Sequence, residues 1–86
     1  MDLQELQART LENPFRSGTE VMLAMTEELG EVATEVALLE RIGTKANWQK
    51  EPSTERLAEE IKHLLNCTFA LANQFGIDLN EAYRPK

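Results

Sequence analysis

Four side chains in two spaced pairs are the residues of this sequence best suited to chemistry. Glu28 and Glu31 stand three residues apart, and so do Glu60 and His63. On a helix such a spacing places both side chains on one face, so that they reach toward one point. Carboxylate oxygens and an imidazole nitrogen are donors that divalent metal ions accept. These four residues are therefore candidate metal ligands.

The spacing alone does not single out these pairs in so acidic a chain. Two further acid pairs have it, Asp2/Glu5 and Asp78/Glu81. What distinguishes Glu28 and Glu31 is their angle to the apolar row of their helix, about 60° and about 120° from its centre at ~100° per residue. Glu60 and His63 have the same two offsets on the next long helix. The two helices therefore carry matching polar edges.

Capping and breaking residues divide the chain into four predicted helices. The helices cover residues 2–12, 18–41, 54–75 and 79–84. Ser17, with Glu20 three residues later, forms a capping pattern, Ser53 or Thr54 caps the third helix, and Asp78 caps the last. Pro14 breaks the first helix, and the second and third end near Gly43 and Gly76. Residues 43–53 are predicted to form a loop that contains Trp48, and the fold class is all-α.

Each long helix carries apolar residues at alternating spacings of four and three. The rows are Met25, Leu29, Val32, Val36, Leu39 and Leu57, Ile61, Leu64, Thr68, Leu71, Phe75. Two such rows facing each other predict an antiparallel helical hairpin with short flanking helices. A single hairpin leaves one side of each helix uncovered. We expect a second copy to cover it, so that dimerisation completes a four-helix-bundle core in this single domain of residues 1–86.

An antiparallel hairpin brings the two polar edges into one pocket. Three carboxylates packed there repel one another unless a cation neutralises them. Mg²⁺ is the expected resident because it prefers carboxylate oxygens, waters and substrate phosphates. The alternative is that Glu28, Glu31 and Glu60 are solvated surface charges and His63 is an ordinary half-exposed histidine.

Composition excludes several classes of partner. Nine basic residues against fifteen acidic ones give a net charge of −6, which disfavours a nucleic acid polymer. No apolar run is long enough to span a membrane, and the N-terminus does not resemble a secretion signal, so we expect a cytoplasmic protein. The one cysteine, Cys67, has no internal partner. A domain of 86 residues without disulfides is commonly stabilised by self-association into a homodimer or tetramer.

The polar edges and the C-terminal segment resemble the MazG-type all-α nucleoside triphosphate pyrophosphohydrolases. The resemblance covers residues 19–86, and its motifs are residues 27–33, 59–65 and 76–82. The family has a Glu-x-x-Glu pair on one helix and a Glu-x-x-Asp pair on the next. The resemblance implies hydrolysis of a nucleoside triphosphate to the monophosphate and pyrophosphate with Mg²⁺, Mn²⁺ being an alternative.

Glu28, Glu31 and Glu60 match the catalytic and metal-binding glutamates of the family, whereas His63 stands where the family has aspartate. The imidazole suits Mn²⁺, Co²⁺, Ni²⁺ or Zn²⁺ better than Mg²⁺. Three outcomes follow: altered metal preference, weak binding of one Mg²⁺ by the glutamates, or loss of catalysis with the fold and nucleotide affinity retained. The resemblance also places Lys86, with Arg84, on the substrate phosphates.

The nucleotide base requires a flat side chain to pack against. Phe15, Trp48 and Tyr83 are the candidates, although such an aromatic residue is more often part of the core than a platform for a base. Glu27 and Glu35 are further candidates for an outer ligand or a water-orienting base. Cys67, one turn after His63, is interpreted as a buried structural thiol.

Three functions are compatible with the sequence. The first is a metal-dependent nucleotide pyrophosphohydrolase. The second is a catalytically impaired nucleotide-binding or regulatory module on the same fold. The third is a plain helical dimerisation module whose acidic edge only keeps it soluble.

Overall fold

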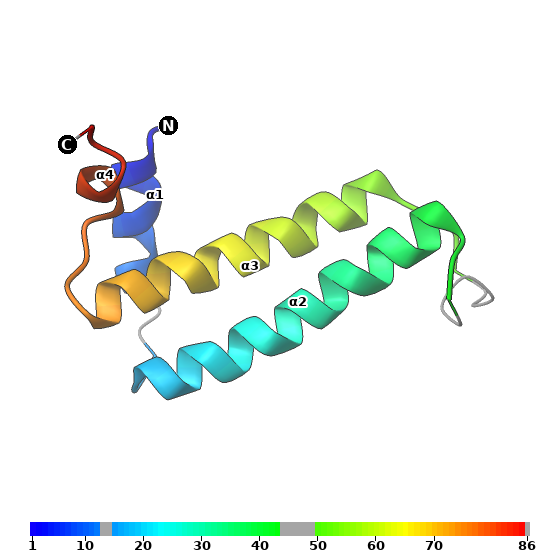
Figure 1. The fold of residues 1–86 in the computed structure, drawn as a ribbon, viewed down its shortest axis with the longest axis horizontal. Coiled ribbons are helices and arrows are strands. Elements are labelled where there is room, and N and C mark those ends of the chain that lie inside the picture. Colours follow the sequence, from blue (N-terminus) through cyan, green and yellow to red (C-terminus); the bar gives the residue numbers. More distant parts are fainter. Residues whose placement is uncertain (13–14, 44–49, 86) are drawn as a thin grey trace.

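Two long antiparallel helices form the body of the molecule (Figure 1). They are α2, Gly18–Glu40, and α3, Thr54–Gln74, and they pack along most of their length. The structure, a computed structural model, describes residues 1–12, 15–43 and 50–85. Every regular element in these ranges is helical, which confirms the all-α class and the packing of one long helix on another.

The predicted N-terminal caps of the long helices are present. The Ser17 hydroxyl accepts a hydrogen bond from the Glu20 amide at 3.1 Å, and the Ser53 hydroxyl accepts one from the Arg56 amide at 3.1 Å. The α2 helix ends at Arg41, before Gly43, because Arg41 adopts a left-handed conformation with φ 55°. The Ile42 amide then donates to the Ala37 carbonyl and closes the helix end.

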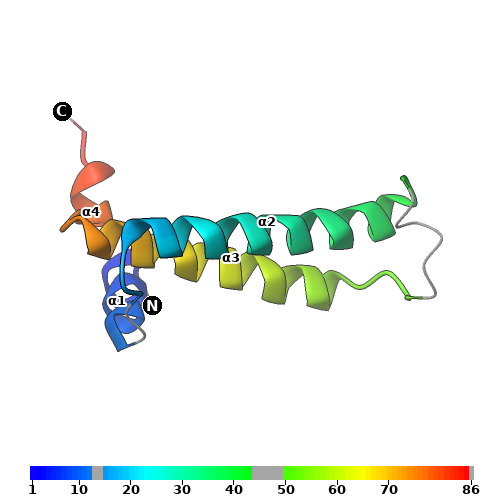
Figure 2. The same ribbon diagram turned by 90° about the horizontal axis from the view of Figure 1, so that it is seen from below.

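Shorter elements pack where α3 ends. The first predicted helix divides into α1, Leu3–Arg9, and a 3₁₀ turn, η1, Thr10–Glu12. The last helix, α4, is Leu79–Ala82, shorter than predicted. Figure 2 shows α1 projecting from one side of the α2–α3 layer and α4 from the other.

The buried side chain of Gln7 fixes α1 to the end of α3. Its amide nitrogen donates to the Asn73 side chain at 2.8 Å and to the Ile77 carbonyl at 2.7 Å. Its amide oxygen accepts a hydrogen bond from the Leu79 amide at 3.1 Å. Asn73 also donates to Thr10. A buried amide is stable only when its groups are paired, so this network determines where α1 lies.

The apolar core between α2 and α3 is small. Val21, Cys67 and Ala70 are buried at its centre, and Phe15, Ala24, Met25 and Leu71 pack around them. It fills the space between the start of α2 and the C-terminal half of α3. The other half of the helix pair is therefore held together by different contacts.

The predicted apolar rows lie only partly on the line of contact, where Met25 and Leu71 pack on the core. Residues of α2 spaced by seven, Val21, Glu28 and Glu35, face α3, whereas Leu29 is 57% exposed. On α3, Ile61 is 48% exposed. Each residue is turned by about 100° from the one before it, so Leu29 points away from α3 when Glu28 faces it. The line of contact between two helices is also narrower than an apolar row. Part of each row is therefore left outside the pair.

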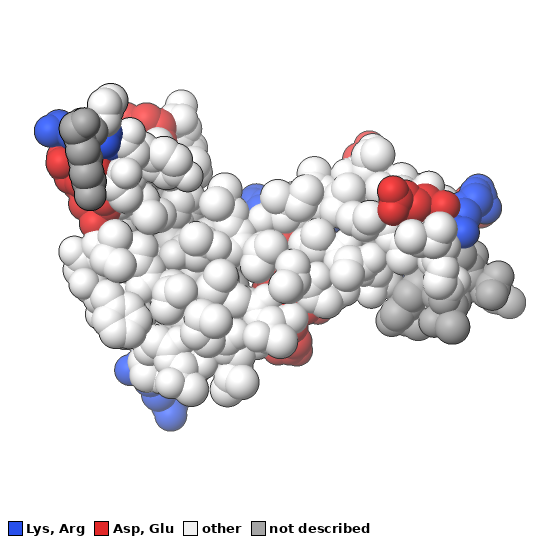
Figure 3. All heavy atoms as spheres, viewed as in Figure 1, with Lys and Arg blue, Asp and Glu red and all other residues white. Residues whose placement is uncertain are grey.

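Five of the exposed apolar residues on α2 and α3 share one side of the helix pair. Glu28 and Glu60 face each other from antiparallel helices, so the next residue on each, Leu29 and Ile61, turns to the same side. Figure 3 shows this side of the α2–α3 layer, which carries few charged side chains. We call it the apolar face and define it by its exposed large residues: Met22, Leu29, Val36, Ile61 and Leu65.

Candidate metal centre

Three of the four predicted ligands converge between α2 and α3. The His63 Nδ1 atom lies 3.7 Å from Glu28 Oε2 and 3.7 Å from Glu60 Oε2. One donor atom from each of the three residues lies within 4.8 Å of the other two. Glu28 comes from α2, whereas Glu60 and His63 come from successive turns of α3. The helix pairing therefore brings together residues that are far apart in the sequence.

Two oxygen atoms of this cluster have no partner. Glu28 Oε2 and Glu60 Oε2 are inaccessible to solvent, and neither forms a hydrogen bond within the described part of the chain. The remainder of each side chain is partly open, with exposed fractions of 25% and 21%. A buried carboxylate oxygen without a donor is unfavourable, so the arrangement favours occupation by a cation.

Glu31, the fourth predicted ligand, belongs to the same cluster. Burial raises the pKa of Glu28, and the negative charge of Glu31 raises it further. The pKa of Glu60 is raised first by the hydrogen bond that it can share with the Glu31 side chain when one of the two carboxyl groups is protonated, then by burial and by the Glu31 charge. The His63 ring opposes both increases. We call Glu28, Glu31, Glu60 and His63 the acidic cluster.

The donor set fits a divalent metal ion. Carboxylate oxygens accept Mg²⁺ and Mn²⁺, and an imidazole nitrogen favours the transition metals over Mg²⁺. Glu28, Glu60 and His63 are the residues whose donor atoms lie closest together. Glu31 is near enough to shift the pKa of both other glutamates and so to compete for the same cation.

Glu59 and Lys62 border the cluster on α3. Glu59 lies 2.9 Å from the Lys62 ammonium and 3.8 Å from the second nitrogen of the His63 ring. The Lys62 hydrogen bond and positive charge lower the pKa of Glu59. Both side chains of the Glu59–Lys62 pair are more than half exposed, so the pair is weak and easily exchanged for other contacts.

The two outer candidates on α2 differ in environment. Glu27 is exposed beside the cluster. Glu35 is buried two turns away, and its carboxylate lies 3.0 Å from the Arg56 guanidinium, which also donates to the Glu51 carbonyl. Because Arg56 already neutralises it, Glu35 stabilises the helix pair and is not available as an outer ligand.

The remaining predicted residues lie apart from the acidic cluster or outside the described residues. Arg84 follows α4 and is ion-paired with Glu81 at 3.3 Å. It lies beyond the end of α3, and that end is itself roughly three helical turns after His63. Tyr83 is largely exposed at the same end. Phe15 packs on the core between α2 and α3. Trp48 and Lys86 are outside the described residues.

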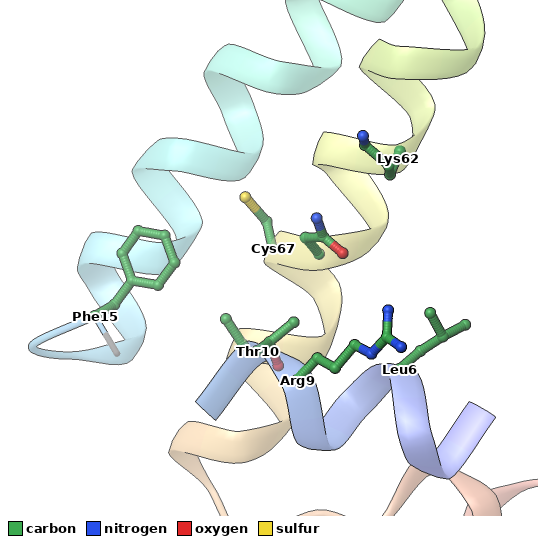
Figure 4. Close-up of a pocket in the computed structure, with 8 residues that line it drawn as sticks. Leu6, Arg9, Thr10, Phe15, Lys62 and Cys67 are labelled. Atoms are coloured by element: carbon green, nitrogen blue, oxygen red, sulfur yellow. The ribbon is translucent and has the colours of Figure 1, made fainter. Parts of the chain in front are cut away.

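A cavity of about 420 Å³ is lined by Lys62, the residue that precedes His63 of the acidic cluster, among others (Figure 4). It is formed by α1, α3 and the segment before α2, and its lining residues are Leu6, Arg9, Thr10, Phe15, Lys62, Asn66, Cys67 and Ala70. The sequence predictions included only Phe15 as a ligand-binding residue of this set. The others were missed because α1 contacts α3 through residues 66 positions apart.

Cys67 lines the cavity and also lies near Glu28 of the acidic cluster. It is buried in the core. Burial raises the pKa of its thiol, and the nearby charge of Glu28 raises it further. At physiological pH the residue is therefore a neutral thiol, in agreement with the structural role expected from the sequence.

Known proteins offer no relative from which the role of the site could be inferred. No protein-family model, curated protein or solved structure matches this chain. Among the described residues, no helix combines the length and hydropathy needed to cross a membrane.

Proposed function

We propose that this chain is a metal-dependent nucleoside triphosphate pyrophosphohydrolase that converts a nucleoside triphosphate to the monophosphate and pyrophosphate. The observation that carries the proposal is the pair of buried oxygens on Glu28 and Glu60 that lack a hydrogen-bond partner among the described residues, with His63 beside both. A chain that required only helix packing would place apolar or paired side chains there. The resemblance of the two Glu-containing motifs to the MazG-type enzymes supplies the reaction.

The cluster residues have separate roles in this proposal. Glu28, Glu60 and His63 hold the cation, and Glu31 completes its coordination or orients the attacking water. A bound divalent cation neutralises charge on the phosphate oxygens and lowers the pKa of water near it. Water attacks one of the phosphorus atoms flanking the α–β bridging oxygen. The bond from that phosphorus to the bridging oxygen breaks, the water proton passes to a carboxylate, and the monophosphate and pyrophosphate leave.

His63 shifts the metal preference of the site. With aspartate at this position the cluster would offer four carboxylates, a set suited to Mg²⁺. The imidazole removes one negative charge and adds a nitrogen ligand, so Mn²⁺ supports greater activity than Mg²⁺ in this proposal. His63→Asp is expected to reverse that order.

The apolar face supports dimerisation into a four-helix core. Leu29 and Ile61 are 57% and 48% exposed on the same side of the helix pair, away from the acidic cluster. A second copy would bury them without covering the cluster. Light scattering is expected to give twice the mass of one chain, and Ile61→Glu is expected to yield the monomer. A monodisperse monomer for the unmodified chain contradicts this part of the proposal.

The activity test is the release of pyrophosphate from the common ribo- and deoxyribonucleoside triphosphates with Mg²⁺ or Mn²⁺. Glu60→Gln keeps the shape of the side chain and removes its charge, so we expect a loss of at least about 100-fold in turnover. Glu55→Gln, an exposed change on the same helix, is the matched control and should leave turnover unchanged. No pyrophosphate from any triphosphate with either metal contradicts the catalytic proposal.

The two other functions are distinguished by binding measurements. Nucleotide binding without pyrophosphate release favours the impaired binding or regulatory module. The sequence feature that points to this alternative is His63 in place of the family aspartate. A melting temperature unchanged by Mg²⁺ and Mn²⁺ favours the plain dimerisation module, because a metal that binds only the folded state must raise it.

A further inference from the structure

The cavity between α1 and α3 has the size and shape of a small-molecule site. Its volume of about 420 Å³ lies within the range of ~300–1,000 Å³ that is common for ligand pockets. Its walls come from three separate parts of the chain, and Phe15, Leu6 and Ala70 make them partly apolar. A flat organic group can therefore be enclosed on more than one side.

The two charged residues that line the cavity are both cationic, in contrast to the net negative charge of the chain. Arg9 extends from α1 and Lys62 from α3, so two positive charges border one space. None of the described side chains is ion-paired with Arg9, and Lys62 has only its exposed pair with Glu59. Guanidinium and ammonium groups in this arrangement select an anion such as a phosphate.

The position of the cavity connects it to the acidic cluster. Lys62 and His63 are neighbours on α3, and Asn66 and Cys67 lie one turn further on, at a rise of about 5 Å per turn. Glu31 lies three residues after Glu28, and His63 lies three residues after Glu60. Because Glu28 and Glu60 face each other, this step turns both later side chains to the side of the helices that carries the cavity. A ligand in the cavity therefore reaches the cluster without crossing α2 or α3.

We propose that this cavity binds the nucleoside end of a nucleotide, with the base against Phe15 and the phosphates held by Arg9 and Lys62 on their way to the acidic cluster. The inference rests on the proposed function for the identity of the ligand. It assigns phosphate binding to Arg9 and Lys62, and it gives Arg84 no role in binding. The Asn66 amide, with both a donor and an acceptor, is the group placed to contact the base or sugar.

Binding of nucleoside monophosphates without metal tests the site separately from catalysis. Titration calorimetry with the eight common ribo- and deoxyribonucleoside monophosphates should detect binding of at least one of them. Arg9→Gln and Lys62→Gln should each weaken it by about 5-fold or more, since each removes a charge-assisted contact. Lys50→Gln, which removes an exposed positive charge outside the cavity lining, is the matched control and should leave the affinity unchanged. Arg84→Gln tests the phosphate contact that the resemblance gave to Arg84. All four side chains are exposed, so none is required for folding.

The single cysteine provides a second measurement that needs no substitution. Cys67 lines the cavity, so a saturating monophosphate should slow its alkylation by iodoacetamide several-fold, whereas inorganic phosphate at the same concentration should have a smaller effect. No monophosphate binding, unchanged alkylation at saturation, or weakening by Arg84→Gln alone overturns the inference. Monophosphate binding without pyrophosphate release would instead sustain the inference and contradict the catalytic proposal.

Discussion

Two acidic sites between the same two helices differ in whether a permanent cation neutralises them. Glu35 is 5% exposed and lies 3.0 Å from the Arg56 guanidinium. Glu28, seven residues earlier on the same face of α2, has a buried oxygen without a hydrogen-bond partner in the described part of the chain. The nearest cationic group to Glu28 and Glu60 is the half-exposed ring of His63 at 3.7 Å, which carries a charge only when protonated.

The difference shows that this helix pair can supply a permanent cation to a buried carboxylate. It does so where the carboxylate is structural and not where three carboxylates meet. A site without its own cation is less stable when empty and more stable when a cation enters it. The comparison therefore supports the acidic cluster as a binding site and Glu35 as part of the scaffold.

Removing the cation of the scaffold pair should give the largest loss of stability. Arg56→Gln leaves Glu35 buried and unpaired, and it also removes the contact with the Glu51 carbonyl. We expect the free energy of unfolding to fall by roughly 2 kcal/mol, less than for a fully buried pair because Arg56 is partly exposed. Urea denaturation measures it, and the exposed change Lys50→Gln is the control. A loss below about 0.5 kcal/mol would mean that the two sites do not differ in this way.

Supplying the missing cation to the cluster should have the opposite effect. His63→Arg places a permanent charge near Glu28 and Glu60, so the metal-free protein should gain roughly 0.5–1 kcal/mol. A metal ion present at 100 times its dissociation constant should stabilise the folded, unmodified chain by about 2.7 kcal/mol. The His63→Arg variant should lose this stabilisation. Thermal melting with and without Mn²⁺ measures both effects. A variant that still responds to Mn²⁺ would show that the ion binds elsewhere.

The raised pKa values predict a pH dependence of definite sign. Glu28 and Glu60 bind protons more tightly in the folded state than at their ordinary pKa of 4.5. Their contribution to stability is complete below pH 4.5 and is lost as the pH rises through their raised folded values. Relative to the Glu28→Gln/Glu60→Gln double variant, the metal-free protein should therefore melt higher at pH 5 than at pH 7. A difference of the opposite sign contradicts the desolvated, mutually repelling carboxylates described above.

The sequence predicted most of the helical elements and the meeting of Glu28, Glu60 and His63 between two of them. Capping residues such as Ser17 and Ser53 placed the helix starts correctly, because their hydrogen bonds are local. The offsets of Glu28 and Glu60 followed from helix geometry alone. The structure brings these residues together with His63, which the matching offsets on two antiparallel helices had predicted.

The sequence could not predict features that depend on contacts between distant segments. Leu29 and Ile61 are apolar, but a single sequence does not show whether such residues face the neighbouring helix or a second copy. Periodicity reports how broad the apolar row is, not where the contact line falls within it. The cavity was equally hidden, because it requires Gln7 to bind Asn73 across 66 residues.

A small effect is also expected at Gly30, which stands between the two acidic sites on α2. A Cβ atom built at this position meets nothing within 4 Å, so alanine can be accommodated without a steric clash. Glycine within a helix costs about 0.8–1 kcal/mol relative to alanine, so Gly30→Ala should stabilise the isolated chain by up to that amount. The gain should be equal with and without Mn²⁺, because position 30 points away from the acidic cluster. A gain that disappears as the protein concentration rises would show that a second copy packs closely against Gly30. If the stability gain of Gly30→Ala is lost only when Mn²⁺ is bound, then binding of the metal requires α2 to bend at Gly30. The Glu35–Arg56 pair would not require such a bend.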